Sequence, residues 1–570
     1  MHDIIRIMKI ALAQLNATVG DIPGNLEKIR AAVREARALG AALVVTPELA
    51  ICGYPPEDLL LRDDFLADCE EAVAALAREC TDLTVVVGHP QRAGGRRYNA
   101  ASVLAGGRVT AQYFKHALPN YTVFDEERYF ASGDAPCVFE TGGVHFGINI
   151  CEDTWGAEGA AAALPQPHGA GPHFGTNIGP GAVLATAPHA ARAAGAQVLL
   201  ALNASPYHTR QQASRHEVVS KRARETGLPV IYVNLVGGQD ELVFDGASFV
   251  VDAGGQVMHE LPRFAEALGI VEFDGVSPRC GAIAPPQSQE AEVYAALKLG
   301  VQDYIGKNGF PGALLGLSGG IDSALTLAIA ADALGADQVR AVMMPSQYTA
   351  GMSVEDARRQ AQLMGVRLDE IAIKPMYDAF AAALAPAFKG LAADTTEENL
   401  QSRIRGTLLM ALSNKTGAIV LTTGNKSEMG TGYATLYGDM AGGFAVLKDI
   451  NKLLVYRLSN YRNGLGAVIP QRVIDRPPSA ELRPDQTDQD SLPPYETLDA
   501  IMEAYVERDM SPADIVALGH AQSDVERVIR LIRLSEYKRR QAPVGIRVTP
   551  RGFGKDWRYP ITNRYRPRFA

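Results

Sequence analysis

The chain has 570 residues, of which 47% are hydrophobic and 21% are charged, with a formal net charge of -9 at pH 7. One hydrophobic core seldom organises so many residues, so we expect two globular domains and little disorder. The acidic balance disfavours nucleic-acid binding, because such proteins usually carry a basic excess that pairs with phosphates.

The first fifteen residues do not have the pattern of a secretion signal, because Asp3, Arg6 and Lys9 interrupt their apolar run. No later stretch reaches membrane-spanning length without a charge or a turn residue. The cysteines have no CxxC pair and no spacing typical of a disulfide framework or a zinc site. We therefore expect a protein of the reducing cytoplasm that does not bind membranes. The six cysteines are Cys52, Cys69, Cys80, Cys137, Cys151 and Cys280.

Short β-type runs alternate with helical stretches or loops from Met8 to about Val276. This alternation is typical of a layered α/β domain. Several runs end at a polar or reactive residue, such as Glu48, Cys151 and Asn203, and strand ends are where sheets commonly present chemistry. The runs span residues 9–15, 42–49, 83–90, 144–151, 196–205 and 228–236.

A stretch that contains prolines and glutamines, Ala284–Gln289, precedes a helical pattern from Glu290 to Lys307 and predicts a linker. Beyond it, residues 313–335 have the pattern of a strand, a glycine turn and a helix, and residues 340–346 that of the next parallel strand. A second, doubly wound α/β domain is therefore expected. The predicted boundaries are 8–276 for the first domain, 277–289 for the linker and 290–570 for the second domain.

Two further stretches have the composition of surface loops. Gly156–Pro188 is rich in alanine, glycine, proline and histidine, and Pro477–Pro494 is rich in proline and aspartate. Such composition alone predicts exposed connections.

The motif Ser318-Gly319-Gly320-Ile321-Asp322-Ser323 lies between the apolar strand and the apolar helix of the second domain. Its glycines allow a tight turn, so backbone N–H groups converge on an anion at the helix N-terminus. The hydroxyls add donors, and Asp322 can hold a metal that bridges phosphates. A chance glycine turn before a helix is the alternative. No GK[ST] follows, so this is not a Walker motif, and SGGxDS instead resembles the pyrophosphate loop of ATP pyrophosphatases.

Three residues of the first half, each within an extended motif, resemble the Glu-Lys-Cys triad of the nitrilase superfamily. Glu48 stands in TPELAICGYPPE, Lys115 in YFKHALPNY and Cys151 in GINICEDTW. In this chemistry Glu48 takes the thiol proton, Lys115 stabilises the oxyanion and Cys151 attacks an amide. Taken singly, Cys151 would more often be a buried small hydrophobe, and Glu48 and Lys115 exposed charges at strand ends.

The remaining motifs of the second half resemble NAD synthetases. LTTGNKSE contains Thr423 and Glu428, and SEYKRRQ contains Lys538 at what we expect to be the end of a helix. Asn399 lies on the first turn of a predicted helix for which Thr395 and Glu398 form a capping box. The Pro477–Pro494 stretch resembles a mobile loop that closes over the site in that family.

Together these motifs resemble glutamine-dependent NAD(+) synthetases, in which a nitrilase-type glutaminase domain is fused to an ATP-pyrophosphatase-type synthetase domain. The resemblance implies an α/β fold, with an N-terminal nitrilase-like α-β-β-α sandwich followed by a C-terminal doubly wound parallel-sheet domain. It implies that glutamine supplies ammonia to adenylated deamido-NAD(+), giving NAD(+), AMP, diphosphate and glutamate. It also implies a homo-oligomer with an internal ammonia tunnel, although no residue pattern shows a tunnel.

The same resemblance assigns binding roles, with Mg²⁺ as cofactor of the ATP. Arg215 is assigned to glutamine, but pairing with a carboxylate alone is an open alternative. Glutamine would contact Tyr54, Tyr121, Glu126, Trp155, Ser205 and Arg215. ATP would contact Gly316, Leu317, Ser318, Gly319, Gly320, Ile321, Asp322, Ser323 and Thr423. Deamido-NAD(+) would contact Asn399, Glu428 and Lys538, and the metal would contact Asp322 and Glu428.

Three other functions stay open at this point. One is an amidotransferase with a different adenylated acceptor, and another is a hydrolase whose second domain only binds nucleotide. The third is a non-catalytic scaffold of nitrilase fold, against which the intact set of Glu48, Lys115 and Cys151 counts.

Overall fold

The computed structural model describes residues 7–156, 186–479, 481–483, 492–563 and 565. The chain divides into two compact units, Met1–Pro286 and Gln287–Ala570. The division lies within the stretch expected to be a linker, and Ser277–Pro278 at the start of that stretch form a short strand. None of the helices within these ranges combines the length and the apolar character that crossing a bilayer requires.

Two stacked sheets form the centre of the first unit. In each sheet the middle strands are parallel, and antiparallel strands complete the edges. The first sheet has the order β15 (Ser277–Pro278), β14 (Ala267–Asp274), β1 (Ile7–Gln14), β2 (Leu43–Val45), β3 (Thr84–Ala93), β4 (Arg96–Ala105) and β5 (Arg108–Phe114). The second has the order β13 (Val257–Glu260), β12 (Phe249–Val251), β9 (Val230–Asn234), β8 (Val198–Asn203), β7 (Val144–Ile150) and β6 (Val138–Thr141). A separate hairpin pairs β10 (Val236–Gln239) with β11 (Leu242–Asp245).

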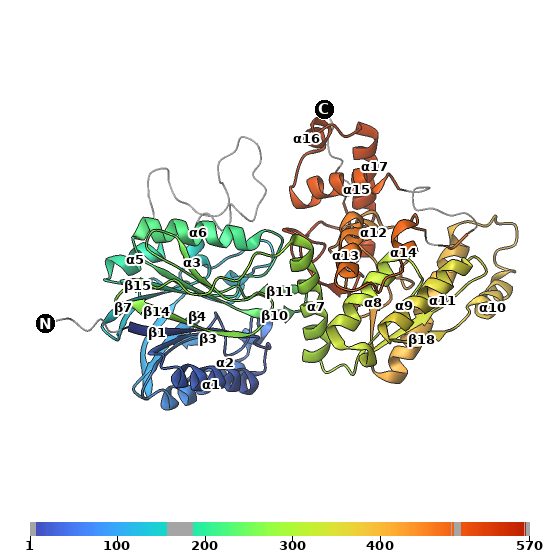
Figure 1. The fold of residues 1–570 in the computed structure, drawn as a ribbon. Coiled ribbons are helices and arrows are strands. Elements are labelled where there is room, and N and C mark those ends of the chain that lie inside the picture. Colours follow the sequence, from blue (N-terminus) through green and yellow to red (C-terminus); the bar gives the residue numbers. More distant parts are fainter. Residues whose placement is uncertain (1–6, 157–185, 480, 484–491, 564, 566–570) are drawn as a thin grey trace. The chain divides into compact units, whose positions relative to one another are not determined.

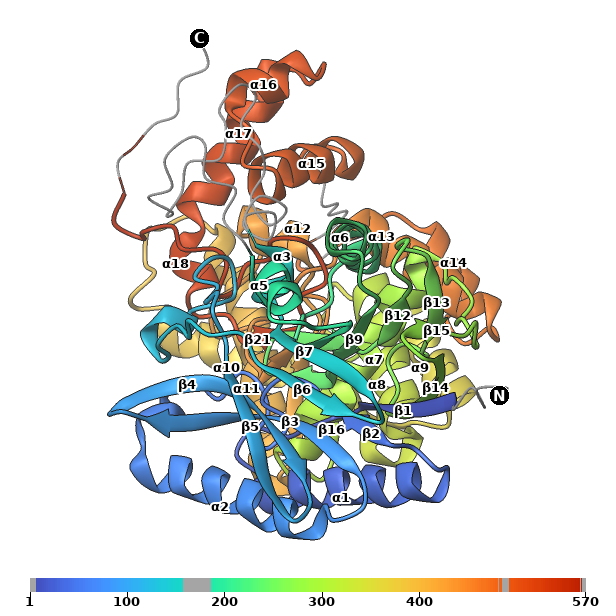
Figure 2. The same cartoon turned by 90° about the vertical axis from the view of Figure 1, so that its left-hand side faces the viewer.

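Helices cover the outer face of each sheet (Figures 1 and 2). α1 (Ile22–Ala38) and α2 (Asp63–Glu79) pack on the first sheet, and α5 (Ala187–Ala193) and α6 (Gln211–Thr226) pack on the second. α1 begins at the Asp21 cap, and its apolar residues recur every three or four positions on the buried face. The expected α-β-β-α sandwich is confirmed, and each of the six predicted strands is present.

The core between the two sheets explains why their strands are apolar almost throughout. Side chains from both sheets, among them Leu12, Val45, Phe146 and Leu200, form one buried cluster. Because the central strands are covered on both faces, they have apolar residues at nearly every position, and polar residues appear mainly where each strand ends. The polar residues at those ends therefore stand out in the sequence.

The second unit is built on a fully parallel sheet. Its order is β18 (Arg367–Glu370), β17 (Val339–Met343), β16 (Ala313–Gly316), β19 (Ile419–Thr422), β20 (Phe444–Ala445) and β21 (Val544–Gly545). The chain runs outward from β16 to β18 and then returns to β19 on the other side of β16. The reversal marks the carboxyl ends of β16 and β19 as the position at which doubly wound folds bind ligands. The predicted doubly wound domain is confirmed.

Helices lie on both faces of this sheet (Figure 1). α7 (Gln289–Lys307), α8 (Ile321–Leu334) and α13 (Lys452–Gly464) pack together on one face. α10 (Lys374–Leu384) and α11 (Thr395–Thr416) cover the strand side chains of the other. A separate hydrophobic cluster is formed by side chains of α12 (Lys426–Thr431), α15 (Tyr495–Met502) and α17 (Gln522–Leu534). Further α-helices among the described residues of this unit are α9 (Gly351–Met364), α14 (Gln471–Asp475), α16 (Pro512–Ala517) and α18 (Glu536–Arg539).

One local prediction in this unit was wrong. The capping box of α11 is formed by Asp394 and Glu397, one residue before the pair we predicted at Thr395 and Glu398. Lys538 lies in the last turn of a helix as expected, although this helix is the short α18, which is separated from α17 at Leu534.

Candidate active sites

The three predicted catalytic residues of the first unit meet between the two sheets. Glu48 follows β2, Lys115 follows β5 and Cys151 follows β7, and all three are buried. Lys115 Nζ donates to Glu48 Oε1 at 2.7 Å and to Glu126 Oε1 at 2.9 Å. The fold thus brings together residues that lie far apart in the sequence.

The Glu48 carboxylate is held by two further donors. Asn99 Nδ2 donates to Oε1 at 2.7 Å, and the backbone N–H of Ala204 donates to Oε2 at 2.9 Å. A buried carboxylate needs such partners, because it has lost its hydrogen bonds to water. Sequence reasoning missed Asn99, whose one signal is a buried amide among mostly apolar residues of β4.

Lys115 lies between two carboxylates. Burial opposes its charged form, but Glu126 and Glu48 raise the pKa of Lys115 well above its usual value. Burial raises the pKa of Glu126, and Lys115 counteracts this increase. Tyr54 adds a hydroxyl that donates to Glu126 Oε1 at 2.8 Å. The arrangement keeps a positive charge at the centre of the site.

Cys151 occupies a strained turn between β7 and α3 (Glu152–Trp155). Its φ of 44° and ψ of -100° are unusual for a residue with a side chain, and its N–H donates to Leu202 O at 2.8 Å. Burial raises the pKa of its thiol well above the ordinary value, the Glu48 carboxylate adds to this, and Lys115 opposes it. The thiol is therefore neutral at rest and needs a base when it reacts.

Three further residues predicted to bind glutamine lie around the catalytic residues. Tyr121 donates its hydroxyl to Glu152 Oε2 at 2.8 Å, and burial raises the pKa of Glu152 to about 8. Trp155 is buried in α3, next to the turn that carries Cys151. Ser205 lies two residues beyond the end of β8.

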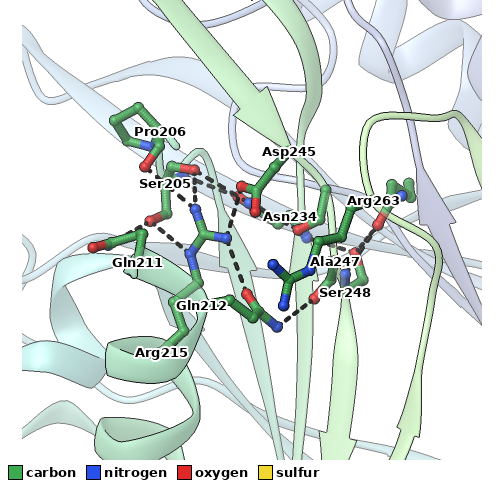
Figure 3. A network of polar contacts seen from close by, with 12 residues as sticks. Ser205, Pro206, Gln211, Gln212, Arg215, Asn234, Asp245, Ala247, Ser248 and Arg263 are labelled. Atoms are coloured by element: carbon green, nitrogen blue, oxygen red, sulfur yellow. Dashed lines mark hydrogen bonds and ion pairs between the residues drawn. The ribbon is translucent and has the colours of Figure 1, made fainter. Parts of the chain in front are cut away.

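Arg215 is completely buried in α6 and paired with Asp245, whose Oδ1 lies 2.7 Å from its Nη1 (Figure 3). Its other guanidinium hydrogens also have protein acceptors. This geometry favours the open alternative, pairing with a carboxylate, over direct contact with glutamine.

In the second unit the SGGIDS loop folds into a compact turn. Gly319 has a φ of +82°, and a Cβ on it would lie 2.3 Å from Ser353 O, so only glycine fits. Ser323 Oγ accepts from Ser318 N at 3.2 Å and donates to Gly320 O at 2.9 Å. Gly320 caps α8, while Gly316 and Leu317 connect β16 to the turn. The loop is thus preorganised at a helix N-terminus.

Two carboxylates predicted to hold a metal, Asp322 of this loop and Glu428 of α12, share one cation. Lys452 Nζ lies 2.5 Å from Asp322 Oδ2 and 3.6 Å from Glu428 Oε1. Asn425 Nδ2 donates to Asp322 Oδ1 at 2.8 Å, and Glu428 also completes a capping box with Asn425. Sequence reasoning missed Lys452, because nothing in its local pattern distinguishes it from a surface lysine.

The other predicted substrate contacts lie nearby in the same unit. Thr423 follows β19 directly and is half-buried. Asn399 Oδ1 accepts from Thr435 Oγ1 at 2.9 Å, and Lys538 Nζ donates to Gly432 O at 2.8 Å and Ala434 O at 2.7 Å. The structure therefore brings Asn399 and Lys538 to one segment, residues 432–435.

The two predicted loops are described only in part. Glu481, within Pro477–Pro494, accepts from Ser353 Oγ at 2.6 Å, so this part of the loop packs beside the SGGIDS turn. Residues 480 and 484–491 lie outside the described residues, as do residues 157–185 of Gly156–Pro188.

Two family models match the chain, one in each unit. The carbon-nitrogen hydrolase model matches residues 9–170 and 171–278, and the NAD synthase model matches residues 293–542.

Relatives match over nearly the full length. A glutamine-dependent NAD(+) synthetase of Xanthomonas campestris is 49% identical over 568 residues, covering 98% of each chain. One from Xylella fastidiosa is 48% identical, covering 98% of this chain and 99% of the relative. A structure of the Acinetobacter baumannii glutamine-dependent NAD+ synthetase in complex with ADP is 44% identical, with a TM-score of 0.76, and covers 98% of this chain and 99% of that one.

Gly88 of β3 gives a test of the first site. A Cβ on Gly88 would lie 2.4 Å from Pro47 O and 2.7 Å from Leu49 N, so Gly88→Ala must displace the turn that carries Glu48. We expect ammonia release from glutamine to fall on the order of a hundredfold, since a shift of about 1 Å in a catalytic group can cost that much. A coupled ammonia assay measures it.

The matched control is Gly306→Ala in α7, where a Cβ would meet open space. Its ammonia release should equal that of the unchanged protein. Full activity of Gly88→Ala would show that the position of Glu48 is not critical.

Proposed function

The chain belongs to the glutamine-dependent NAD(+) synthetase family, and from this premise we propose how its residues divide the reaction. The first unit hydrolyses glutamine, and the second unit uses ATP to join the released ammonia to deamido-NAD(+). The full-length match to relatives of that name favours deamido-NAD(+) over a different adenylated acceptor. The observation that carries the proposal is the buried 2.7 Å contact between Lys115 and Glu48 at the Cys151 turn.

In the first half-reaction Cys151 Sγ attacks the side-chain carbonyl carbon of glutamine. Glu48 takes the thiol proton in the same step, which the raised pKa of Cys151 requires. The Lys115 ammonium stabilises the negative charge that develops on the carbonyl oxygen. When the C–N bond breaks, Glu48 returns the proton to the departing ammonia, and water then cleaves the thioester to glutamate.

In the second half-reaction the nicotinate carboxylate of deamido-NAD(+) attacks the α-phosphate of ATP, and diphosphate leaves. Ammonia then attacks the adenylated carboxyl carbon, and AMP leaves with the C–O bond electrons. We assign the grip on diphosphate to residues 318–323, whose turn lies at the N-terminus of α8. Thr423 would contact ATP, and Asn399, Glu428 and Lys538 would contact deamido-NAD(+).

The position of Lys452 supports a cation site at Asp322 and Glu428, because its ammonium lies within 4 Å of both carboxylates. Mg²⁺ commonly binds one or two carboxylates together with substrate phosphates, so this pair suits it. Bound there with ATP, Mg²⁺ would neutralise charge on the phosphates.

A homo-oligomeric state and a cytoplasmic location are part of the same proposal. They rest on the family to which the chain belongs. The internal ammonia tunnel stays a prediction.

Cys151→Ala separates the two half-reactions. We expect glutamine-driven NAD(+) formation to fall at least about a thousandfold, because the nucleophile is gone, while ammonium-driven formation is retained. Chromatographic assay of NAD(+) with either nitrogen source measures both. Cys280→Ala, at an exposed cysteine, is the control. Equal loss with both sources would contradict the assignment, and equal activity with glutamine would indicate a scaffold.

Asp322→Ala tests the second half-reaction. It removes the partner of Lys452 and one proposed metal ligand, so NAD(+) formation should fall on the order of a hundredfold with either nitrogen source. Diphosphate release that depends on deamido-NAD(+) reports the same loss. Asp337→Ala, at an exposed position after α8, should change neither quantity. Survival of ammonium-driven synthesis in Asp322→Ala would refute the role of Asp322.

A further inference from the structure

A buried ion pair lies beside the glutaminase site, and the mechanism above does not use it. Arg215 of α6 and Asp245 of β11 are both completely buried, with Nη1 and Oδ1 2.7 Å apart (Figure 3). Burial opposes the charge, but Asp245 raises the pKa of Arg215 above its ordinary value. A buried ion pair seldom adds much stability over apolar side chains of the same size. Stability alone therefore does not explain the Arg215–Asp245 pair, and the contacts of its side chains indicate its role.

The Arg215 guanidinium spreads its hydrogens over one short segment. Nε donates to Ser205 Oγ at 3.2 Å, and Nη2 donates to Ser205 O at 2.8 Å and to Pro206 O at 3.3 Å. Nη1 donates to Asp245 and, at 3.0 Å, to Gln212 Oε1. The second oxygen of Asp245 has no hydrogen-bond partner among the described residues, so the carboxylate serves mainly to orient the arginine.

Asn234, at the end of β9, holds the same segment from another direction. Its Oδ1 accepts from Ser205 N at 2.9 Å, and its Nδ2 donates to Ser205 O at 3.2 Å and to Gly246 O at 3.1 Å. The N–H, the carbonyl and the hydroxyl of Ser205 are thus all restrained. The preceding residue is Ala204, whose N–H donates to Glu48 Oε2 at 2.9 Å.

We propose that the Arg215–Asp245 pair is a positioning unit for glutamine hydrolysis, which fixes the Ser205–Pro206 backbone so that the Ala204 N–H orients the general base Glu48. The inference rests on the proposed function. It differs from the role first assigned to Arg215, because in this account Arg215 acts through the backbone and not by contact with glutamine.

Paired substitutions separate positioning from stability. Arg215→Met alone leaves Asp245 buried without a counter-ion, so this variant should melt at a lower temperature. The double variant Arg215→Met with Asp245→Leu removes both charges and should regain most of the melting temperature. It still lacks the donors to Ser205 and Pro206. We therefore expect its kcat for glutamine hydrolysis to stay on the order of a hundredfold below that of the unchanged protein, with little change in KM.

Arg215→Lys gives a second measurement that does not depend on the double variant folding. A lysine keeps the charge opposite Asp245 but lacks the planar fork of donors. Its kcat should fall less than that of Arg215→Met, again without a matching rise in KM. Arg224→Met, at an exposed position on the same helix, is the matched control and should keep kcat and KM unchanged.

Ammonium-driven NAD(+) formation should stay unchanged in every one of these variants. If the double variant regains kcat together with its melting temperature, the pair is only structural and the inference fails. If KM for glutamine rises strongly at unchanged kcat, Arg215 binds the substrate directly and the inference also fails. If the unchanged protein releases no ammonia from glutamine, the proposed function fails instead.

Discussion

The first unit depends on one buried ammonium ion. Lys115 lies between two carboxylates, at 2.7 Å from Glu48 and 2.9 Å from Glu126, and all three side chains are buried. A positive charge there is tolerable only because both carboxylates accompany it. The same charge is what an oxyanion needs, and the same carboxylate is what the Cys151 thiol needs as a base. Structural stability and chemistry therefore impose the same requirement on these residues.

The second unit also places a buried ammonium ion between two carboxylates, beyond the carboxyl ends of two central strands of its parallel sheet. Asp322 and Glu428 follow β16 and β19, and Lys452 from the start of α13 lies within 4 Å of both. Here the cation lies beside a turn of backbone N–H groups at a helix N-terminus, a setting suited to phosphates. The two units thus place charge at strand ends, the first to activate a thiol and the second to receive a nucleotide.

The pattern of apolar runs and helices predicted two α/β domains, and strand ends such as Glu48 and Cys151 stand out where apolar runs stop. The other candidate site residues were predicted from the resemblance of their motifs to known families. Partners supplied by distant segments were not predictable. Asn99 and the Ala204 N–H lie 51 and 156 residues from Glu48, and no local pattern connects either of them with that carboxylate. Lys452 was not predicted for the same reason, and Asp245 was not identified as the carboxylate that pairs with Arg215. The capping box of α11 was displaced by one residue, because neighbouring residues offered chemically similar caps.

The central claim is that the buried Cys151 thiol attacks glutamine with Glu48 as base and Lys115 at the oxyanion. Acid quenching of the enzyme during turnover with glutamine, followed by mass spectrometry of its peptides, tests this most directly. The account predicts a γ-glutamyl adduct on the peptide that carries Cys151. An adduct on a different residue, or sustained ammonia release with no adduct at all, would contradict it.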